Sequence, residues 1–265
     1  MRLTEEQSRF YDTFGFLKFP GLFKAEAECI TEAFEKVFED EFRETGRRHD
    51  YEQRSSIIPF ADRSEFLSGL LDDPRIDGVV ASILGDDYGY GTSDGNYYVG
   101  DTKWHSDHLP DDPYHSLKVA FYLDPVRSDT GCLRVIPGSC NWEDKFTKSV
   151  NEVVPVSTAS RPELWGIHGS EVPAYAIESD PGDMLLFNHK LKHSSWGGSD
   201  LRRMFTYNFE QHFPDNLIGC LREILVPFRE SGDAAPYGEA LLRTAGPERK
   251  RHLQQRLQVW EQLTT

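Results

Sequence analysis

Short runs rich in β-branched and aromatic residues fill the stretch between Tyr88 and Phe209. Glycine, proline, aspartate and serine separate these runs. Runs of this length with turn residues at their ends indicate β-strands, and several in succession are typical of an all-β barrel or sandwich. We therefore predict strands at residues 96–99, 117–123, 133–136, 172–177, 184–187 and 202–209.

Helical patterns lie on both sides of this β-rich stretch. Thr4 and Gln7 have the spacing of a capping box, in which each side chain bonds a backbone N–H at the start of a helix, and Gly15 ends that helix. Further helices are predicted at residues 24–44, 74–85, 214–228 and 247–263, with a strand at 16–19. We therefore predict a single domain over residues 1–265, divided into a mainly helical part (1–85), a β core (86–210) and C-terminal helices (211–265).

Composition excludes several classes of protein. A chain of 265 residues with 38% hydrophobic residues can bury a large core, which excludes disorder. Its net charge of −15 would repel the phosphates of nucleic acids and anionic lipids. No apolar run approaches the roughly 20 residues that span a bilayer, and the N-terminus lacks the pattern of a signal peptide. We therefore expect a cytoplasmic protein without nucleic-acid or membrane partners.

His105 and Asp107 are the first residues that suggest chemistry. They lie two positions apart, so in an extended segment both side chains project from one face and can share a metal ion. His193, which follows the predicted strand at 184–187, supplies a third ligand. Two histidines and one carboxylate form the facial triad of non-haem Fe(II) oxygenases, which leaves coordination positions open for a 2-oxo acid and dioxygen.

Arg202 and Ser195 are candidates for binding the 2-oxo acid. In the predicted strand at 202–209, alternate positions form a mostly polar face that includes Arg202 and an aromatic face. Since the aromatic face suits packing beneath helices, we expect Arg202 to point towards the metal ligands and Arg203 to point away. A guanidinium can hold a carboxylate with two hydrogen bonds, and the Ser195 hydroxyl can add another.

Four stretches together resemble the phytanoyl-CoA dioxygenase family of Fe(II)/2-oxoglutarate-dependent oxygenases. They are LTEEQ (3–7) with 14–17 and 20–23, WHSD (104–107), GCL (131–133) with IPGS (136–139), and 182–195 with Arg202. The resemblance implies a mainly β fold with flanking helices, whose core is a double-stranded β-helix of the jelly-roll or cupin-like type. It implies iron bound by His105, Asp107 and His193, and 2-oxoglutarate anchored by Arg202 with help from Ser195. It also implies O2-dependent hydroxylation of an unactivated C–H bond of a small-molecule substrate, with release of succinate and CO2.

The sequence departs from the family pattern in two places. The segment from His193 to Arg202 is shorter than is usual, which leaves Arg203 as an alternative anchor. A tryptophan that the family usually carries is absent, and Phe121 or Tyr122 stands near its place.

Other residues are expected near the site. On the strand before the His-x-Asp motif, the resemblance places Asn96 and Tyr98 against 2-oxoglutarate. Because Asp107 is a carboxylate, halogenation is disfavoured, since that reaction needs the same coordination position for chloride. Hydroxylation or a desaturation-like variant remains. Arg54 and Arg63 lie in an irregular segment and are candidates for binding an anionic group of the substrate.

Two other hypotheses are compatible with the same residues. A cupin-like metal enzyme, such as an isomerase or a 2-oxoglutarate-independent dioxygenase, could use the His/Asp/His site. A non-catalytic binding protein could retain the ligands without turnover. Arg202 separates these hypotheses, because an anchor for a 2-oxo acid has no purpose in a reaction without one. His108 and His115 are candidates for substrate contact, whereas His189 is expected to be structural.

Overall fold

The computed structural model describes residues 1–154, 156, 162–198, 201–232 and 235–263. Strands dominate the middle of the chain. They are β1 (Phe16–Phe19), β2 (Ser55–Ile57), β3 (Gly89–Tyr98), β4 (Thr102–His105), β5 (Ser116–Tyr122), β6 (Leu133–Val135), β7 (Glu163–Leu164), β8 (Ile167–His168), β9 (Tyr175–Ile177), β10 (Met184–Asn188), β11 (His193–Ser195) and β12 (Arg202–Glu210).

Ten of these strands form two antiparallel sheets, and β7 and β8 pair separately. The larger has the order β1-β10-β5-β12-β3-β2, and the smaller has the order β4-β11-β6-β9. Strands distant in sequence are neighbours in both sheets, as in a jelly roll. Each sheet has open edges, so the described strands do not close into a barrel. The predicted mainly β core with flanking helices is confirmed.

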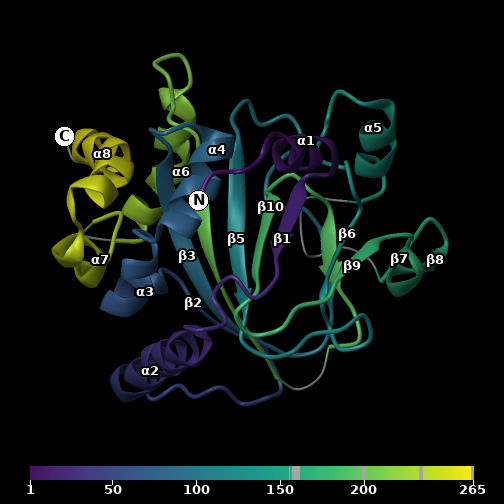
Figure 1. Ribbon diagram of the computed structural model, residues 1–265, viewed down its shortest axis with the longest axis horizontal. Helices are drawn as coiled ribbons and strands as arrows, with labels where there is room; N and C mark the ends of the chain where they lie inside the picture. The colour runs from purple at the N-terminus through teal and green to yellow at the C-terminus, as the bar shows by residue number, and fades with distance from the viewer. Residues whose placement is uncertain (155, 157–161, 199–200, 233–234, 264–265) are drawn as a thin grey trace.

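The helices gather mostly at one side of the larger sheet. Figure 1 shows α2 (Ala27–Thr45), α3 (Glu65–Leu70), α7 (Glu239–Thr244) and α8 (Pro247–Gln262) beside β3, whereas β6, β9 and the paired β7 and β8 lie on the opposite side of β5. Of the described helices, none combines the length and apolarity required to cross a bilayer. That the chain forms a single domain stays a prediction.

The helices are α1 (Glu5–Phe14), α2 (Ala27–Thr45), α3 (Glu65–Leu70), α4 (Pro74–Leu84), α5 (Lys145–Asn151), α6 (Ile218–Glu230), α7 (Glu239–Thr244) and α8 (Pro247–Gln262), with 3₁₀ turns at Ala61–Arg63 and Gly169–Glu171.

Local signals account for the first helix. The Thr4 hydroxyl accepts from the Gln7 N–H at 3.3 Å, and the Gln7 side chain accepts from the Thr4 N–H at 3.0 Å, as a capping box requires. Gly15 ends α1 in a left-handed conformation with φ +83°. In contrast, α2 begins later than the predicted residue 24, because residues 21–26 form hydrogen-bonded turns.

β3 is much longer than the pattern predicts. The predicted strand covers 96–99, whereas β3 begins at Gly89. Its glycines are typical of turns, but β12 pairs with it along its whole length. Position 95 requires glycine, because the Cβ of any other residue would lie 2.2 Å from the Phe60 ring. Tertiary pairing therefore overrides the local turn preference.

Several short elements have no pattern of their own. β2, β4 and β11 are too short for alternation to be detected, and α3, α5 and α7 were not predicted. The predicted strand at 172–177 is shortened to β9, because Val172 caps the preceding 3₁₀ turn. The helix predicted at 214 begins at Ile218, after a turn in which the Leu217 N–H donates to the Pro214 carbonyl.

Alternation along β12 divides the core into two layers. Phe205, Tyr207 and Phe209 pack with helix residues on one side of the larger sheet, as predicted. Met204, on the other face, packs with residues of the smaller sheet. Arg202 shares the face of Met204, so it points into the space between the two sheets.

Candidate metal centre

His105 and His193 lie side by side because of the strand pairing in the smaller sheet. β4 and β11 are antiparallel, and His193 is directly opposite His105. The centroids of the two imidazole rings are 4.2 Å apart, and both side chains are buried. The fold thus brings together two histidines that are far apart in the sequence.

Asp107 completes a group of three possible ligands. β4 ends at His105, so Asp107 lies in the following bend, which corrects the expectation that both share one face of a strand. The Asp107 N–H donates to the His189 carbonyl at 2.9 Å and ties this bend to the turn before β11. Its carboxylate oxygens lie 3.9 Å from Nε2 of His105 and 3.9 Å from Nε2 of His193. Ligand atoms of the three side chains all lie within 4.8 Å of one another, close enough to share one ion.

Both imidazoles present a nitrogen lone pair to this space. Nδ1 of His105 lies 2.8 Å from the Lys103 carbonyl oxygen, and Nδ1 of His193 lies 2.9 Å from that of Leu191. A carbonyl oxygen only accepts, so Nδ1 carries the proton in both rings. The lone pair is then on Nε2, the atom that faces Asp107. The backbone therefore holds both rings in the tautomer that suits metal binding.

The charge at this centre is set by Asp107 and Lys118. Burial lowers the pKa of His193 to about 3 and also lowers the pKa of His105, so both rings are neutral near pH 7. Burial opposes ionisation of Asp107, but the ammonium group of Lys118 holds its pKa well below the usual range. Lys118 Nζ lies 3.0 Å from Asp107 Oδ2, without the geometry of a hydrogen bond. That oxygen therefore keeps a lone pair with no described donor.

Because these imidazoles are buried as neutral groups, the stability of the metal-free protein should depend on pH. Below the ordinary His pKa of 6.5, the unfolded chain binds a proton at residue 193 that the folded chain, with its pKa of about 3, does not. The free energy of unfolding therefore falls as the pH drops from 6.5 towards 3, by up to about 1.4 kcal/mol per pH unit for this imidazole. Thermal unfolding should give a lower Tm near pH 5 than near pH 7.5, and His193→Gln should reduce the difference. If the Tm differs by the same amount between pH 5 and pH 7.5 in the wild type and in His193→Gln, the imidazole of His193 is not the cause of the pH dependence.

Arg202 lines the same cavity as the three ligands. The cavity has a volume of about 370 Å³. The Arg202 side chain donates to the Gly100 carbonyl oxygen and to Thr102 Oγ1, each at a long 3.4 Å, and its Nε–H has no described partner. Arg202 also has no ion pair with any described carboxylate, although the residue is only 3% exposed. A buried cation of this kind is costly unless an anion joins it.

Arg203 points to the other side of β12. Its guanidinium pairs with Asp124 at 2.5 Å and with Glu35 at 2.7 Å. Arg202 and not Arg203 therefore faces the cavity, as alternation along the strand predicts. Tyr98 also lines the cavity, and its ring centroid lies 5.0 Å from Cζ of Arg202.

Gly131 and Ser195 fix the surroundings of Arg202. The Ser195 hydroxyl donates to the Gly131 carbonyl at 2.6 Å, so its proton is already used within the protein. Gly131 has φ +89°, and a Cβ there would lie 2.1 Å from Nη1 of Arg202. Glycine meets both conditions because it lacks a Cβ and tolerates positive φ.

Gly131→Ala should displace the Arg202 side chain. We expect it to lower the free energy of unfolding by roughly 1–3 kcal/mol, as backbone strain does, and also to weaken binding of 2-oxoglutarate. Gly46→Ala is a matched control, because Gly46 has φ +71° and nothing within 4 Å of an added Cβ. Thermal unfolding should show a lower stability in both variants. Titration with 2-oxoglutarate should show weaker binding only in Gly131→Ala. Unchanged affinity in Gly131→Ala would contradict the close approach.

Asn96 is buried and does not line the cavity. Its Oδ1 accepts from Nε and Nη2 of Arg54 at 2.9 and 2.6 Å, and its Nδ2 donates to Asp94 at 2.6 Å. As placed, Asn96 holds Arg54, and it is Arg54 and Asp94 that line the cavity. Arg63, the other arginine predicted for an anionic substrate group, pairs with Glu41 instead.

The remaining histidines lie outside the cavity lining. His108 and His189 stack with ring centroids 4.5 Å apart. His189 Nε2 also bonds Asn208 Oδ1 at 2.9 Å, which agrees with a structural role. Neither His108 nor His115 is among the described residues that line the cavity.

Lys118 is a charged residue of the site that no sequence motif predicts. It lies on the central strand β5, where Ala120 and Tyr122 share its face and pack between the two sheets. A lysine on an inward-facing position is uncommon, so strict alternation along 116–122 was the signal that could have identified it.

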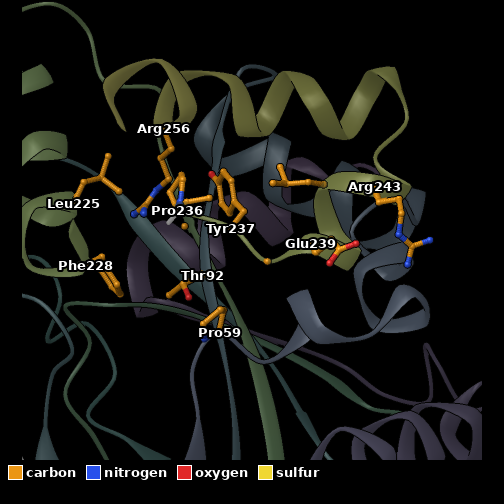
Figure 2. Close-up of a pocket in the computed structure, with 13 residues that line it drawn as sticks. Pro59, Thr92, Leu225, Phe228, Pro236, Tyr237, Glu239, Arg243 and Arg256 are labelled. Carbon is orange, nitrogen blue, oxygen red and sulfur yellow. The ribbon is translucent and has the colours of Figure 1, made fainter. Parts of the chain in front are cut away.

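A larger cavity lies away from the metal ligands. Its volume is about 700 Å³, and residues of β3, α6, α7 and α8 contribute to its lining. Figure 2 shows Arg256 reaching from α8 towards Pro236 and Tyr237, with Phe228 of α6 to one side. Arg256 pairs with the buried Glu210, so its charge is neutralised within the protein. Since the His–Asp–His group and Arg202 line the smaller cavity, that cavity is the candidate site.

Comparison with known proteins is consistent with this geometry. The family model described as Phytanoyl-CoA dioxygenase (PhyH) matches residues 11–204. No curated protein matches the sequence.

Solved structures with the same fold include proteins that bind 2-oxoglutarate or depend on it. HygX from Streptomyces hygroscopicus, with nickel and 2-oxoglutarate bound, is 17% identical, with 80% of this chain and 89% of that chain covered and a TM-score of 0.60. EctD from S. alaskensis, with 2-oxoglutarate and 5-hydroxyectoine, is 22% identical (80% and 77% covered, TM-score 0.58). The non-heme alpha ketoglutarate dependent carbocyclase SnoK from nogalamycin biosynthesis is also 22% identical (79% and 84% covered, TM-score 0.59). These similarities confirm the predicted jelly-roll type of fold.

Proposed function

Because the chain belongs to the phytanoyl-CoA dioxygenase family, we propose that it is an Fe(II)- and 2-oxoglutarate-dependent oxygenase that hydroxylates an unactivated C–H bond of a small molecule. Succinate and CO2 are the other products. The observation that carries this proposal is Arg202, a buried guanidinium that pairs with no described carboxylate, in the same cavity as the His–Asp–His group.

The donor set suits a resident iron. His105 and His193 offer Nε2 lone pairs, and Asp107 offers a carboxylate oxygen with no described hydrogen-bond donor. Two imidazoles and one carboxylate are the ligands typical of non-haem Fe(II) sites with open positions. When bound, the iron supplies the activation of dioxygen that is coupled to decarboxylation of 2-oxoglutarate.

Arg202 is proposed to hold the distal carboxylate of 2-oxoglutarate. The unpartnered Nε–H and the two long hydrogen bonds can be exchanged for bonds to an anion at little cost. Tyr98 supports the guanidinium from its ring face. Ser195 could donate to the same carboxylate only by giving up Gly131, so its first contribution is to fix that glycine.

Apolar residues form one part of the cavity wall. Leu133, Phe187 and Met204 line it beside the ligands, where they can hold the hydrocarbon part of a substrate and exclude water. Asp107 would occupy the coordination position that halogenation leaves to chloride, which argues against halogenation. The fold alone does not select hydroxylation, because a carbocyclase shares it.

The cupin-like alternative has less support. An isomerase or a 2-oxoglutarate-independent dioxygenase could use the same three ligands, but it would leave Arg202 as a buried charge with no anion to bind.

Turnover of 2-oxoglutarate tests the proposed function. With Fe(II) and O2, the purified protein should convert 2-oxoglutarate to succinate, and removal of either the metal or O2 should stop this. Metal-dependent conversion of another compound without succinate would favour the cupin-like alternative.

A further inference from the structure

Arg54 is a second arginine in the metal cavity, and the reaction as proposed does not use it. It directly precedes β2, which pairs with β3. Arg54 and Ile58 are both exposed and both line the cavity, so they mark its solvent side. The guanidinium also lies over the Tyr98 ring, with Cζ 4.6 Å from the centroid.

The Arg54 side chain is held in place without being neutralised. Its Nε and Nη2 both donate to Oδ1 of Asn96, which Asp94 holds in turn through the amide nitrogen. An amide oxygen fixes the guanidinium but carries no net charge. Among the described residues, no carboxylate pairs with Arg54, whereas Lys118 in the same cavity pairs with Asp107.

The charges of the cavity lining also leave room for one anion. Among the described lining residues, the cations are Arg54, Lys118 and Arg202 and the carboxylates are Asp94 and Asp107, which leaves one positive charge. A divalent iron and the dianion of 2-oxoglutarate cancel each other, so that positive charge persists in the loaded site. An excess charge in a partly buried site favours an ion of opposite sign. This excess is positive although the whole chain has a net charge of −15.

We propose that Arg54 binds an anionic group of the substrate, which is therefore a small acid with an apolar body, such as a carboxylate. This inference rests on the proposed function and names its substrate class. Arg202 would hold the cosubstrate. Arg54, at the solvent side of the cavity, would hold the acid that is oxidised. The apolar wall formed by Leu133, Phe187 and Met204 would contact the body of that acid.

Matched acids and amides test this assignment. The anaerobic complex of the full chain with Fe(II) and 2-oxoglutarate would be titrated calorimetrically with straight-chain carboxylates of four to eight carbons and with their primary amides. A charge-assisted hydrogen bond corresponds to roughly a tenfold or larger difference in affinity, so carboxylates should bind at least about tenfold more tightly than amides. Arg54→Gln should remove this preference, and Arg54→Lys should keep most of it.

Controls separate the possible failures. Arg47→Gln removes an exposed arginine outside the cavity lining and should leave the preference unchanged. Arg54→Gln should also leave the affinity for 2-oxoglutarate unchanged. The inference is overturned if the wild type does not prefer acids, if the preference survives Arg54→Gln, or if that variant loses 2-oxoglutarate binding, which would assign Arg54 to the cosubstrate. A wild type that forms no complex with 2-oxoglutarate would instead overturn the proposed function, before any acid is added.

Discussion

Replacing Asp107 by Ala is expected to lower the affinity for Fe(II) by more than about 100-fold and to abolish turnover of 2-oxoglutarate. Loss of groups that merely orient metal ligands already costs about 10- to 100-fold in affinity. Asp107 is the one charged ligand of the three, so its removal should cost more. Equilibrium dialysis of Fe(II) under anaerobic conditions measures the affinity, and succinate release measures the turnover.

A double variant separates metal binding from stability. Asp107→Ala alone leaves Lys118, whose side chain is 14% exposed, without the anion that now lies 3.0 Å away, which should cost up to about 3–5 kcal/mol of unfolding free energy. Adding Lys118→Met removes the unpaired charge, so most of the stability should return while metal binding stays lost. Metal affinity that recovers together with stability would show that Asp107 is not a ligand.

Arg202→Met is expected to weaken 2-oxoglutarate binding by about 100-fold or more. Two charge-assisted hydrogen bonds of about 1.5–3 kcal/mol each account for a loss of this size. The affinity for Fe(II) should not change, because the substitution leaves all three metal ligands in place. The Tm of the protein without cosubstrate should stay the same or rise, since the substitution removes a buried charge that has no ion pair among the described residues. Kinetic titration of 2-oxoglutarate and thermal unfolding measure the two effects.

Arg203→Met is the matched control for this prediction. It removes the neighbouring guanidinium, which pairs with Asp124 and Glu35 outside the cavity. This variant should lower the Tm and leave the affinity for 2-oxoglutarate unchanged. The opposite pattern in the two variants would exchange the roles of Arg202 and Arg203.

The elements that could be predicted are those whose signals are local. The capping box of α1 and the aromatic face of β12 each depend on residues that are close in sequence. The remaining strands depend on pairing between distant segments. β3 contains glycines that favour turns, and it is a strand because β12 pairs with it throughout.

The residues of the candidate site also fall into those that the sequence predicts and those that it does not. His105, Asp107 and His193 could be predicted because few residue types bind iron, and alternation predicted that Arg202 faces inward. Residues whose chemistry is less specific could not be placed by such rules. Lys118 reaches Asp107 because β5 lies at the centre of the larger sheet. Likewise, the amide of Asn96 is taken up by Arg54 and Asp94, a contact that depends on the pairing of β2 with β3.

Anaerobic addition of Fe(II) and then 2-oxoglutarate to the metal-free protein is the most direct test of the central claim. We predict a visible charge-transfer band that appears only when both are present, and that is absent from Asp107→Ala and from Arg202→Met at the same concentrations. Tight binding of the metal with no band upon addition of 2-oxoglutarate would contradict the account and favour a cupin-like enzyme that does not use this cosubstrate.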